Sequence, residues 1–237
     1  PRGVDAERFN AEKRTPECWR DVGMNGAPKV IYVGRVSKEK GLDVLLDAFN
    51  GLLSAGRNEE LAIIGDGPYL RELEEKYPHR SIHFLRYRNG EQLARLYASA
   101  DILAFPSEND TFGNAVVEAH ASGIPVVVVN RGGPQEQVTH GVDGLVIPAG
   151  NTNEMAEAIR TLLDSPRLRK QLGSAGRKRA QAMTWAHAAD AQWSFYMEVW
   201  GRGVSAPKPT AGSGAISAQR GNRNDCHSEQ RDWDQRA

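Results

Sequence analysis

Apolar and polar residues follow a repeating pattern from Lys29 to about Ala182. Short apolar runs, typical of buried strands, are each followed by a stretch with helical spacing of apolar residues. The expected strands are Val30–Val33, Leu61–Ile64, Ile82–Leu85, Ile102–Phe105, Val126–Val129 and Gly144–Ile147. The expected helices are Leu42–Leu53, Tyr69–Lys76, Gly90–Tyr97, Gly113–Ser122, Pro134–Thr139 and Glu154–Leu163. Strands that alternate with helices predict a doubly wound, Rossmann-like α/β fold with a parallel sheet.

Residues typical of helix ends support this division. Gly123 directly follows the expected helix Gly113–Ser122, as glycine commonly does at a helix C-terminus. Asn151 or Thr152 can cap the helix that contains Glu154. Pro166 can open a further helix, whose many Arg and Lys residues most simply form a solvated face. This helix is expected over Arg167–Gln181.

The chain outside this repeat predicts three further segments around a domain at 28–183. Residues 1–27 are polar and turn-forming, so we expect a linker from a missing N-terminal domain, with regular structure only from Lys29. Residues 184–200 predict a helix with an aromatic stripe that includes Trp193 and Trp200. Ordinary core packing is the favoured interpretation of the stripe, and packing on the absent domain is the alternative. Residues 201–237 lose periodicity, which predicts a disordered tail.

Composition excludes several classes of function. The 237 residues carry 30 Lys and Arg against 30 Asp and Glu, so the formal net charge gives no electrostatic basis for nucleic-acid binding. No apolar stretch approaches the roughly 18 residues of a transmembrane helix. The two cysteines, Cys18 and Cys226, lie in the least regular parts of the sequence, which argues against a disulfide framework or a metal site. A cytoplasmic compartment fits this composition best.

The loop after the first expected strand, Gly34 to Gly41, is basic and bounded by glycines. It lies at the carboxyl end of a buried strand, where open α/β sheets bind ligands. Arg35 offers a planar fork for phosphate oxygens, and Lys40 offers a compact positive charge. A solvated basic loop without a ligand is the simpler interpretation of this segment alone.

The loop after the fourth expected strand carries two carboxylates, Asp110 and Glu118. The helix that starts near Gly113 presents unpaired N–H groups and a positive dipole end to a phosphate. The carboxylates can accept hydrogen bonds from hydroxyl groups beside that helix. Together they favour a ligand that is both a phosphate ester and a polyol, such as a nucleotide sugar. Units of this kind often bind nothing, so the combination of loops carries the inference.

Two glycine-containing loops complete the same edge of the sheet. Gly65-Asp-Gly-Pro68 permits tight turning, and Gly132-Gly133 allows either a close backbone approach or a simple turn. Neither forms the G-x-G-x-x-G fingerprint, and no acidic residue occupies the position that a dinucleotide ribose requires. This argues against NAD as a ligand.

These segments, taken in order, resemble the donor-binding, C-terminal half of a retaining GT-B glycosyltransferase of family 4, the glycosyl transferases group 1. The resemblance covers about residues 1–200, including a linker-like Gly3-Val-Asp5. The matching motifs are Gly34 to Gly41, Gly65 to Pro68, His83 to Tyr87, Leu96 to Asp101, Pro106 to Pro125, and Gly132 to Pro148.

The resemblance assigns roles to individual residues. Arg35 and Lys40 match the pair that neutralises the nucleotide diphosphate, next to Gly34. Asp110 matches the first acid of the E-x7-E motif, which contacts the transferred sugar, and Glu118 matches the second, which holds the ribose. The segment that lines the sugar and phosphate site corresponds to Thr111, Phe112, Gly113 and Asn114, and the strand end near the nucleobase to Arg86, Tyr87 and Arg88.

Two departures from the family pattern bear on these roles. Asp110 is one methylene shorter than the usual Glu, and Arg86 stands where a glycine is common.

The resemblance implies hexosyl transfer with retention, without a metal or other cofactor, because protein cations stabilise the leaving diphosphate. The acceptor, whether lipid, glycan or small metabolite, would be held by the missing N-terminal domain, which could also attach the protein to the inner membrane face. We therefore expect the isolated chain to be inactive.

One other function stays open on the residues alone, and a second one lacks support. A non-catalytic nucleotide-binding or scaffold module would keep the fold without the chemistry. A sugar-nucleotide epimerase has a different loop pattern from that around Asp110 and Glu118. The presence of Arg35, Lys40 and Glu118 favours the transferase, because a scaffold does not need them.

Overall fold

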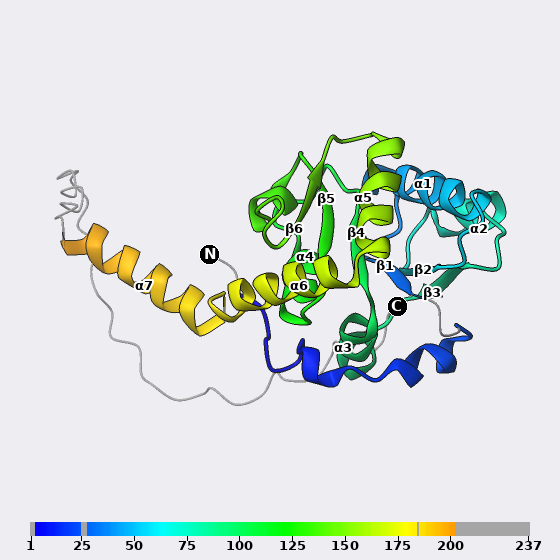
Figure 1. Ribbon diagram of the computed structural model, residues 1–237. Helices are drawn as coiled ribbons and strands as arrows, with labels where there is room; N and C mark the ends of the chain where they lie inside the picture. Colours follow the sequence, from blue (N-terminus) through cyan, green and yellow to red (C-terminus); the bar gives the residue numbers. More distant parts are fainter. Residues whose placement is uncertain (1–2, 25–27, 184, 202–237) are drawn as a thin grey trace, which may run out of the picture. The chain divides into compact units, whose positions relative to one another are not determined.

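The computed structural model describes residues 3–24, 28–183 and 185–201, and its centre is a parallel six-stranded sheet (Figure 1). The strand order is β3-β2-β1-β4-β5-β6. The bounds are Lys29–Val33 for β1, Glu60–Ile64 for β2, Ile82–Arg86 for β3, Ile102–Phe105 for β4, Val126–Val129 for β5 and Gly144–Ile147 for β6. The expected α/β, Rossmann-like fold is confirmed, as is each expected strand.

The helices confirm the predicted alternation and most of the predicted ends. They are α1 (Leu42–Ser54), α2 (Leu70–Lys76), α3 (Gly90–Ser99), α4 (Asn114–Ala121), α5 (Thr152–Asp164), α6 (Pro166–Gln181) and α7 (Trp185–Gly201). The Asn151 side chain accepts a hydrogen bond from the Glu154 N–H at 3.1 Å and so caps α5. Pro166 occupies the first turn of α6. The segment expected as a helix at Pro134–Thr139 is instead a short 3-10 helix, η4 (Gly133–Gln137).

Helices cover both faces of the sheet, which explains why strands β4 and β5 are apolar throughout. Every residue of β4 and β5 is buried, as expected of strands covered on both sides. Helix α1 packs against α5, and α4 packs against α6. Figure 1 shows α1, α2 and α5 on one side of the sheet, with α3 and α6 on the other.

Residues 3–24 are more ordered than the sequence predicts. They contain two 3-10 helices, η1 (Ala11–Lys13) and η2 (Pro16–Val22), so regular structure begins well before Lys29. Trp19 is 2% exposed, and its indole N–H donates to the Ser99 carbonyl at 3.0 Å. The buried area of this aromatic residue fixes the segment against α3, which explains the difference from the prediction. Cys18 lies within η2 and is not in an irregular part.

The C-terminal helix α7 contradicts the favoured interpretation of its aromatic stripe. Trp193, Tyr196 and Met197 are 68, 57 and 55% exposed, so they are not core residues of this domain. Packing on another domain stays a prediction. Contacts group the described residues up to Met197 into one compact unit. The expected disordered tail, apart from Gly201, lies outside the described residues.

Among the described residues, the longest apolar helical stretches fall short of what a membrane-spanning helix requires.

Candidate functional site

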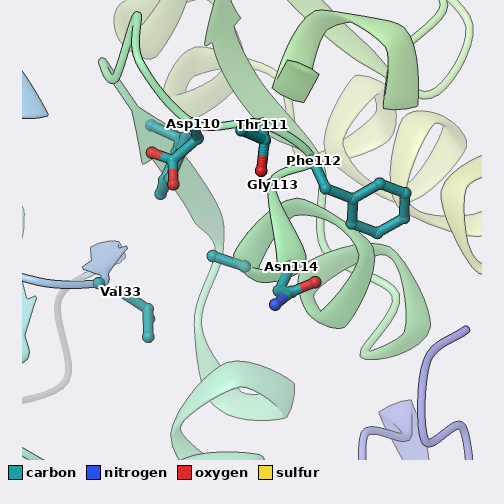
Figure 2. Close-up of a pocket in the computed structure, with 9 residues that line it drawn as sticks. Val33, Asp110, Thr111, Phe112, Gly113 and Asn114 are labelled. Atoms are coloured by element: carbon teal, nitrogen blue, oxygen red, sulfur yellow. The ribbon is translucent and has the colours of Figure 1, made fainter. Parts of the chain in front are cut away.

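A shallow pocket of about 170 Å³ opens at the carboxyl ends of β1 and β4. The chain runs outward from β1 through β2 to β3 and then returns to the other side of β1 at β4. Ligands of open α/β sheets bind at such a reversal of strand order. Figure 2 shows the loop after β4 on one side of the pocket and Val33 of β1 facing it. The lining residues are Val33, Gly34, Phe105, Asp110, Thr111, Phe112, Gly113, Asn114 and Ala115.

The two charged residues predicted to act on the diphosphate and the sugar meet at this pocket. Lys40, at the end of the 3-10 helix η3 (Lys38–Lys40), lies with its ammonium nitrogen 2.9 Å from the Asp110 carboxylate. Their side chains are 16 and 25% exposed, so the pair is partly desolvated. The sequence separates these residues by an α-β-α-β-α-β segment, from α1 to β4. The fold brings them together because β1 and β4 are neighbours in the sheet.

Main-chain hydrogen bonds and the hydroxyl of a tyrosine fix the loop that contains Lys40. The Gly34 N–H donates to the Ile64 carbonyl at 3.0 Å, and the Val36 N–H donates to the Asp66 carbonyl at 2.9 Å. Tyr32 is fully buried in β1, and its hydroxyl donates to the Arg35 carbonyl at 2.9 Å. Burial first, and then the nearby Asp110 charge, raise the pKa of Tyr32, so this hydroxyl keeps its proton.

Arg35 occupies this loop but is not part of the pocket wall. Its side chain is exposed, and the pocket lining includes its neighbour Gly34 instead. The structure therefore places Lys40 against Asp110 and leaves the Arg35 guanidinium in solvent.

The loop after β4 is fixed by the glycine pair of the fifth unit. The Gly133 N–H donates to the Asp110 carbonyl at 2.7 Å. A Cβ on Gly133 would fall on the Thr111 carbonyl group, and a Cβ on Gly132 would fall on the Glu108 carbonyl oxygen. Of the two interpretations of this pair, the structure supports a close backbone approach.

Helix α4 begins directly beside the pocket. Gly113 is its N-cap residue and has a left-handed conformation with φ of 86°, which glycine adopts without a steric penalty. The first N–H groups of an α-helix have no partners within the helix, and they form a site of positive potential. Because Gly113, Asn114 and Ala115 line the pocket together with Asp110, this potential lies at the pocket wall.

Glu118 lies one turn further along α4 and is half-buried. Burial raises its pKa to about 7, although the Tyr97 hydroxyl and the positive charge of Arg8 act in the opposite direction. The carboxyl group is thus close to half ionised near neutral pH. A group in this state responds strongly to a ligand that binds only its charged form.

The residues expected near a nucleobase lie at the end of β3, outside the pocket lining. Arg86 has a φ of 59°, the only positive φ among non-glycine residues in the described part of the chain. This left-handed conformation gives a physical reason for a preference for glycine at this place. The Arg86 side chain pairs with Glu74 at 2.9 Å, and Tyr87 is 65% exposed. The Arg88 guanidinium donates to the Tyr87 carbonyl at 3.1 Å.

A buried histidine anchors the far end of α4. His120 is fully buried, with its Nε2 3.2 Å from the Asp143 carbonyl oxygen. The Asp143 carboxylate pairs with Arg179 of α6 at 3.2 Å. Burial lowers the pKa of His120 to about 4, so the imidazole is neutral in the folded protein.

Some residues of the site were missed by sequence reasoning. Val33 and Phe105 form pocket walls, and a signal for them existed, because each is the last residue of a predicted strand. Tyr32, Tyr97 and Arg8 lie outside the pocket lining and influence residues of the loop and of α4. No local sequence pattern distinguishes them from ordinary core or linker residues.

Known proteins resemble this chain in sequence and in fold. The sequence profile described as Glycosyl transferases group 1 matches residues 21–179. The chain is 35% identical over 195 residues to the sulfoquinovosyl transferase SQD2 of Arabidopsis thaliana, covering 79% of this chain and 37% of that protein. It is 33% identical over 200 residues to a GDP-mannose-dependent alpha-mannosyltransferase of Corynebacterium glutamicum, covering 84% of this chain and 46% of that protein.

A solved structure agrees. Sucrose-phosphate synthase from Thermosynechococcus elongatus superposes with a TM-score of 0.74 and 26% identity, over 86% of this chain and 52% of that one. The chain thus spans about half, or less, of the length of these three proteins. The profile match over most of the ordered domain and the shared sheet architecture lead to one conclusion: the chain belongs to the glycosyl transferases group 1 family.

Proposed function

We propose that this chain is the donor-binding, C-terminal half of a retaining GT-B glycosyltransferase of family 4. It binds a nucleotide-diphosphate sugar, and an N-terminal domain holds the acceptor. The observation that carries the proposal is the meeting of Lys40 and Asp110, 2.9 Å apart, beside the N-terminus of α4 at the reversal of strand order. A cation, a carboxylate and a helix N-terminus at one point suit a ligand that joins phosphates to a sugar.

The proposed chemistry follows from the charges at this point. As the bond between the sugar and the diphosphate breaks, negative charge grows on the leaving group. Lys40 and the first N–H groups of α4 are placed to stabilise that charge, and this requires no metal. Arg35 is exposed in the same loop, and we propose that it turns toward the phosphates when the donor binds.

The carboxylates recognise hydroxyl groups in this proposal. Asp110 accepts hydrogen bonds from the transferred sugar, and Glu118 accepts them from the ribose. The end of β3, from Arg86 to Arg88, contacts the nucleobase. The Lys40–Asp110 pair keeps both charges compensated in the absence of donor, because a lone partly buried charge is costly.

The size of the pocket supports a binding role that is incomplete alone. Its volume of about 170 Å³ is below the roughly 300–1,000 Å³ of sites that enclose a ligand. A second wall is needed to exclude water and to hold an acceptor. We therefore propose that the chain binds the donor but does not transfer the sugar by itself.

The test is a calorimetric titration of the chain with UDP, GDP and ADP, followed by two lysine variants. Lys40→Ala should weaken binding about tenfold or more, because a hydrogen bond to a charged group contributes roughly 1.5–3 kcal/mol. Lys38→Ala is the matched control. It removes the same charge from the same 3-10 helix, but Lys38 is exposed and pairs with Glu72 at 3.0 Å.

Three results would contradict the proposal. The first is the failure of the chain to bind any of the three nucleoside diphosphates. The second is an equal effect of the two lysine variants. The third is sugar transfer by the purified chain alone, which would contradict the need for a second domain.

A further inference from the structure

Tyr97 of α3 has a buried hydroxyl group with no evident role in the ligand-free fold. The residue is 0% exposed, and its hydroxyl finds no partner with hydrogen-bond distance and angle among the described residues. Buried polar side-chain atoms are nearly always paired, so an orphaned one requires an explanation. A phenylalanine would fill the same space without this penalty.

The ring of Tyr97 is fixed by its surroundings. It packs edge-to-face against Phe9 of the N-terminal segment, with ring centroids 5.5 Å apart. Phe9 is itself buried, so the tyrosine cannot swing away from the sheet. The position of its hydroxyl is therefore set by packing before any ligand arrives.

The hydroxyl lies beside Glu118, the carboxylate of the proposed donor site. It is near enough to lower the pKa of Glu118 against the effect of burial, and burial first, and then the Glu118 charge, raise the pKa of Tyr97. The other charged group that acts on Glu118 is Arg8, from the N-terminal segment. His120, two residues further along α4, has its Nε2 within hydrogen-bond distance of the Asp143 carbonyl oxygen.

We propose that Tyr97 is a positioning residue for Glu118. Its hydroxyl donates to one carboxylate oxygen when Glu118 ionises to bind the ribose hydroxyls of the donor, and the other oxygen accepts from the ligand. The inference rests on the proposed function. It explains why a hydroxyl without a partner is kept at a fixed place beside a half-buried carboxyl group.

The variant that tests this role is Tyr97→Phe, which removes the hydroxyl and keeps the ring. Without the Tyr97 hydroxyl, the ionised form of Glu118 is less stable and the pKa of Glu118 rises. The pH at which nucleotide binding reaches half of its maximum should therefore move upward. At pH 7 the affinity should fall about tenfold, as for the loss of a hydrogen bond to a charged group. At higher pH the affinities of the variant and the wild-type chain should converge.

A second readout uses a 2′,3′-dideoxynucleoside diphosphate of whichever base binds. The wild-type chain should bind it more weakly than the ribonucleotide, and Tyr97→Phe should lose most of this difference at pH 7. A purely structural role of Tyr97 would not remove discrimination against the missing ribose hydroxyls. The terminal phosphate of the ligand also titrates near pH 6. Glu118→Gln cannot ionise at this position, so its pH profile shows the contribution of the phosphate alone.

Tyr77→Phe is the matched control. Tyr77 is also buried, but its hydroxyl donates to Asp47 at 2.7 Å, away from the pocket. This variant should leave both the pH profile and the ribose discrimination unchanged.

At pH 5, where Glu118 is protonated, Tyr97→Phe should melt at or above the wild-type temperature, because the Tyr97 hydroxyl then has neither a hydrogen-bond partner among the described residues nor a charge to stabilise. A variant that fails to fold would overturn the proposal, since the hydroxyl would then support the fold itself. An unchanged pH profile with unchanged ribose discrimination would also overturn it. The two proposals can fail separately. If the wild-type chain binds the nucleotide and Lys40→Ala does not, an unchanged pH profile and unchanged ribose discrimination in Tyr97→Phe exclude the role of Tyr97 but leave the proposed function in place.

Discussion

The substitution Gly133→Ala tests how the loop after β4 is held in the site. A Cβ on Gly133 would fall on the Thr111 carbonyl group and 2.7 Å from the Phe112 nitrogen, where real Cβ atoms essentially never come closer than 3.0 Å. The atoms in contact are main-chain atoms, so no flexible side chain can move to make room. The loop or η4 must shift, and the hydrogen bond from the Gly133 N–H to the Asp110 carbonyl at 2.7 Å is then disturbed.

The expected magnitude follows from the cost of overpacking. Insertion of a methyl group into a closely packed place costs about 1–3 kcal/mol. For a chain of this size, each kcal/mol lowers the melting temperature by roughly 2–4 °C. We expect a fall of several degrees, together with weaker nucleotide binding, because Asp110 and Thr111 move relative to Lys40.

The assay is a thermal melt with and without nucleoside diphosphate, alongside Gly51→Ala. Gly51 lies inside α1, and a Cβ there meets nothing within 4 Å. Alanine at this helical position should raise stability by up to about 1 kcal/mol. The reasoning is refuted if Gly133→Ala melts with the wild-type chain and binds nucleotide equally well.

Three further predictions concern stability. The folded-state pKa of His120 is about 4 against an ordinary value of 6.5, so the contribution of this residue to the free energy of unfolding should decrease by roughly 3 kcal/mol as pH falls from 6.5 to 4. Glu118, with its pKa raised to about 7, contributes in the opposite direction, so the contribution of His120 is read from the difference between wild-type and His120→Gln in urea unfolding over this range. His120→Gln should gain stability relative to the wild-type chain as pH falls; an identical pH dependence of the two would contradict the prediction. Arg86→Gly should raise the melting temperature slightly, because relief of the left-handed conformation, about 1 kcal/mol, exceeds the value of the exposed pair with Glu74. A lower melting temperature would argue against strain at this position. Trp19→Ala should cost about 3–5 kcal/mol, whereas exposed Trp193→Ala should change stability by at most about 0.5 kcal/mol, as denaturant melts can show. Equal effects of these two tryptophan variants would mean that burial does not separate them.

Burial of α7 and order in the N-terminal segment were both misjudged from sequence, for related reasons. The helical spacing of Trp193, Tyr196 and Met197 predicts one apolar face but does not state what that face contacts, and in the structure it is exposed. In the N-terminal segment, single aromatic residues such as Phe9 and Trp19 lie among polar ones. Their spacing matches neither a helix nor a strand, so it does not predict that they are buried. Their burial depends on surfaces of α3 that are distant in the sequence.

The sequence alone determined the alternation of strands and helices, the main helix caps and the loops that carry charge. These features are local, because each depends on the spacing of apolar residues and on the backbone preferences of a few glycines and prolines. Only the tertiary structure decided that Lys40 reaches Asp110, that Arg35 stays in solvent and that Tyr97 lies beside Glu118. Those outcomes depend on strand order and on the packing of side chains from distant segments, and no local pattern contains that information.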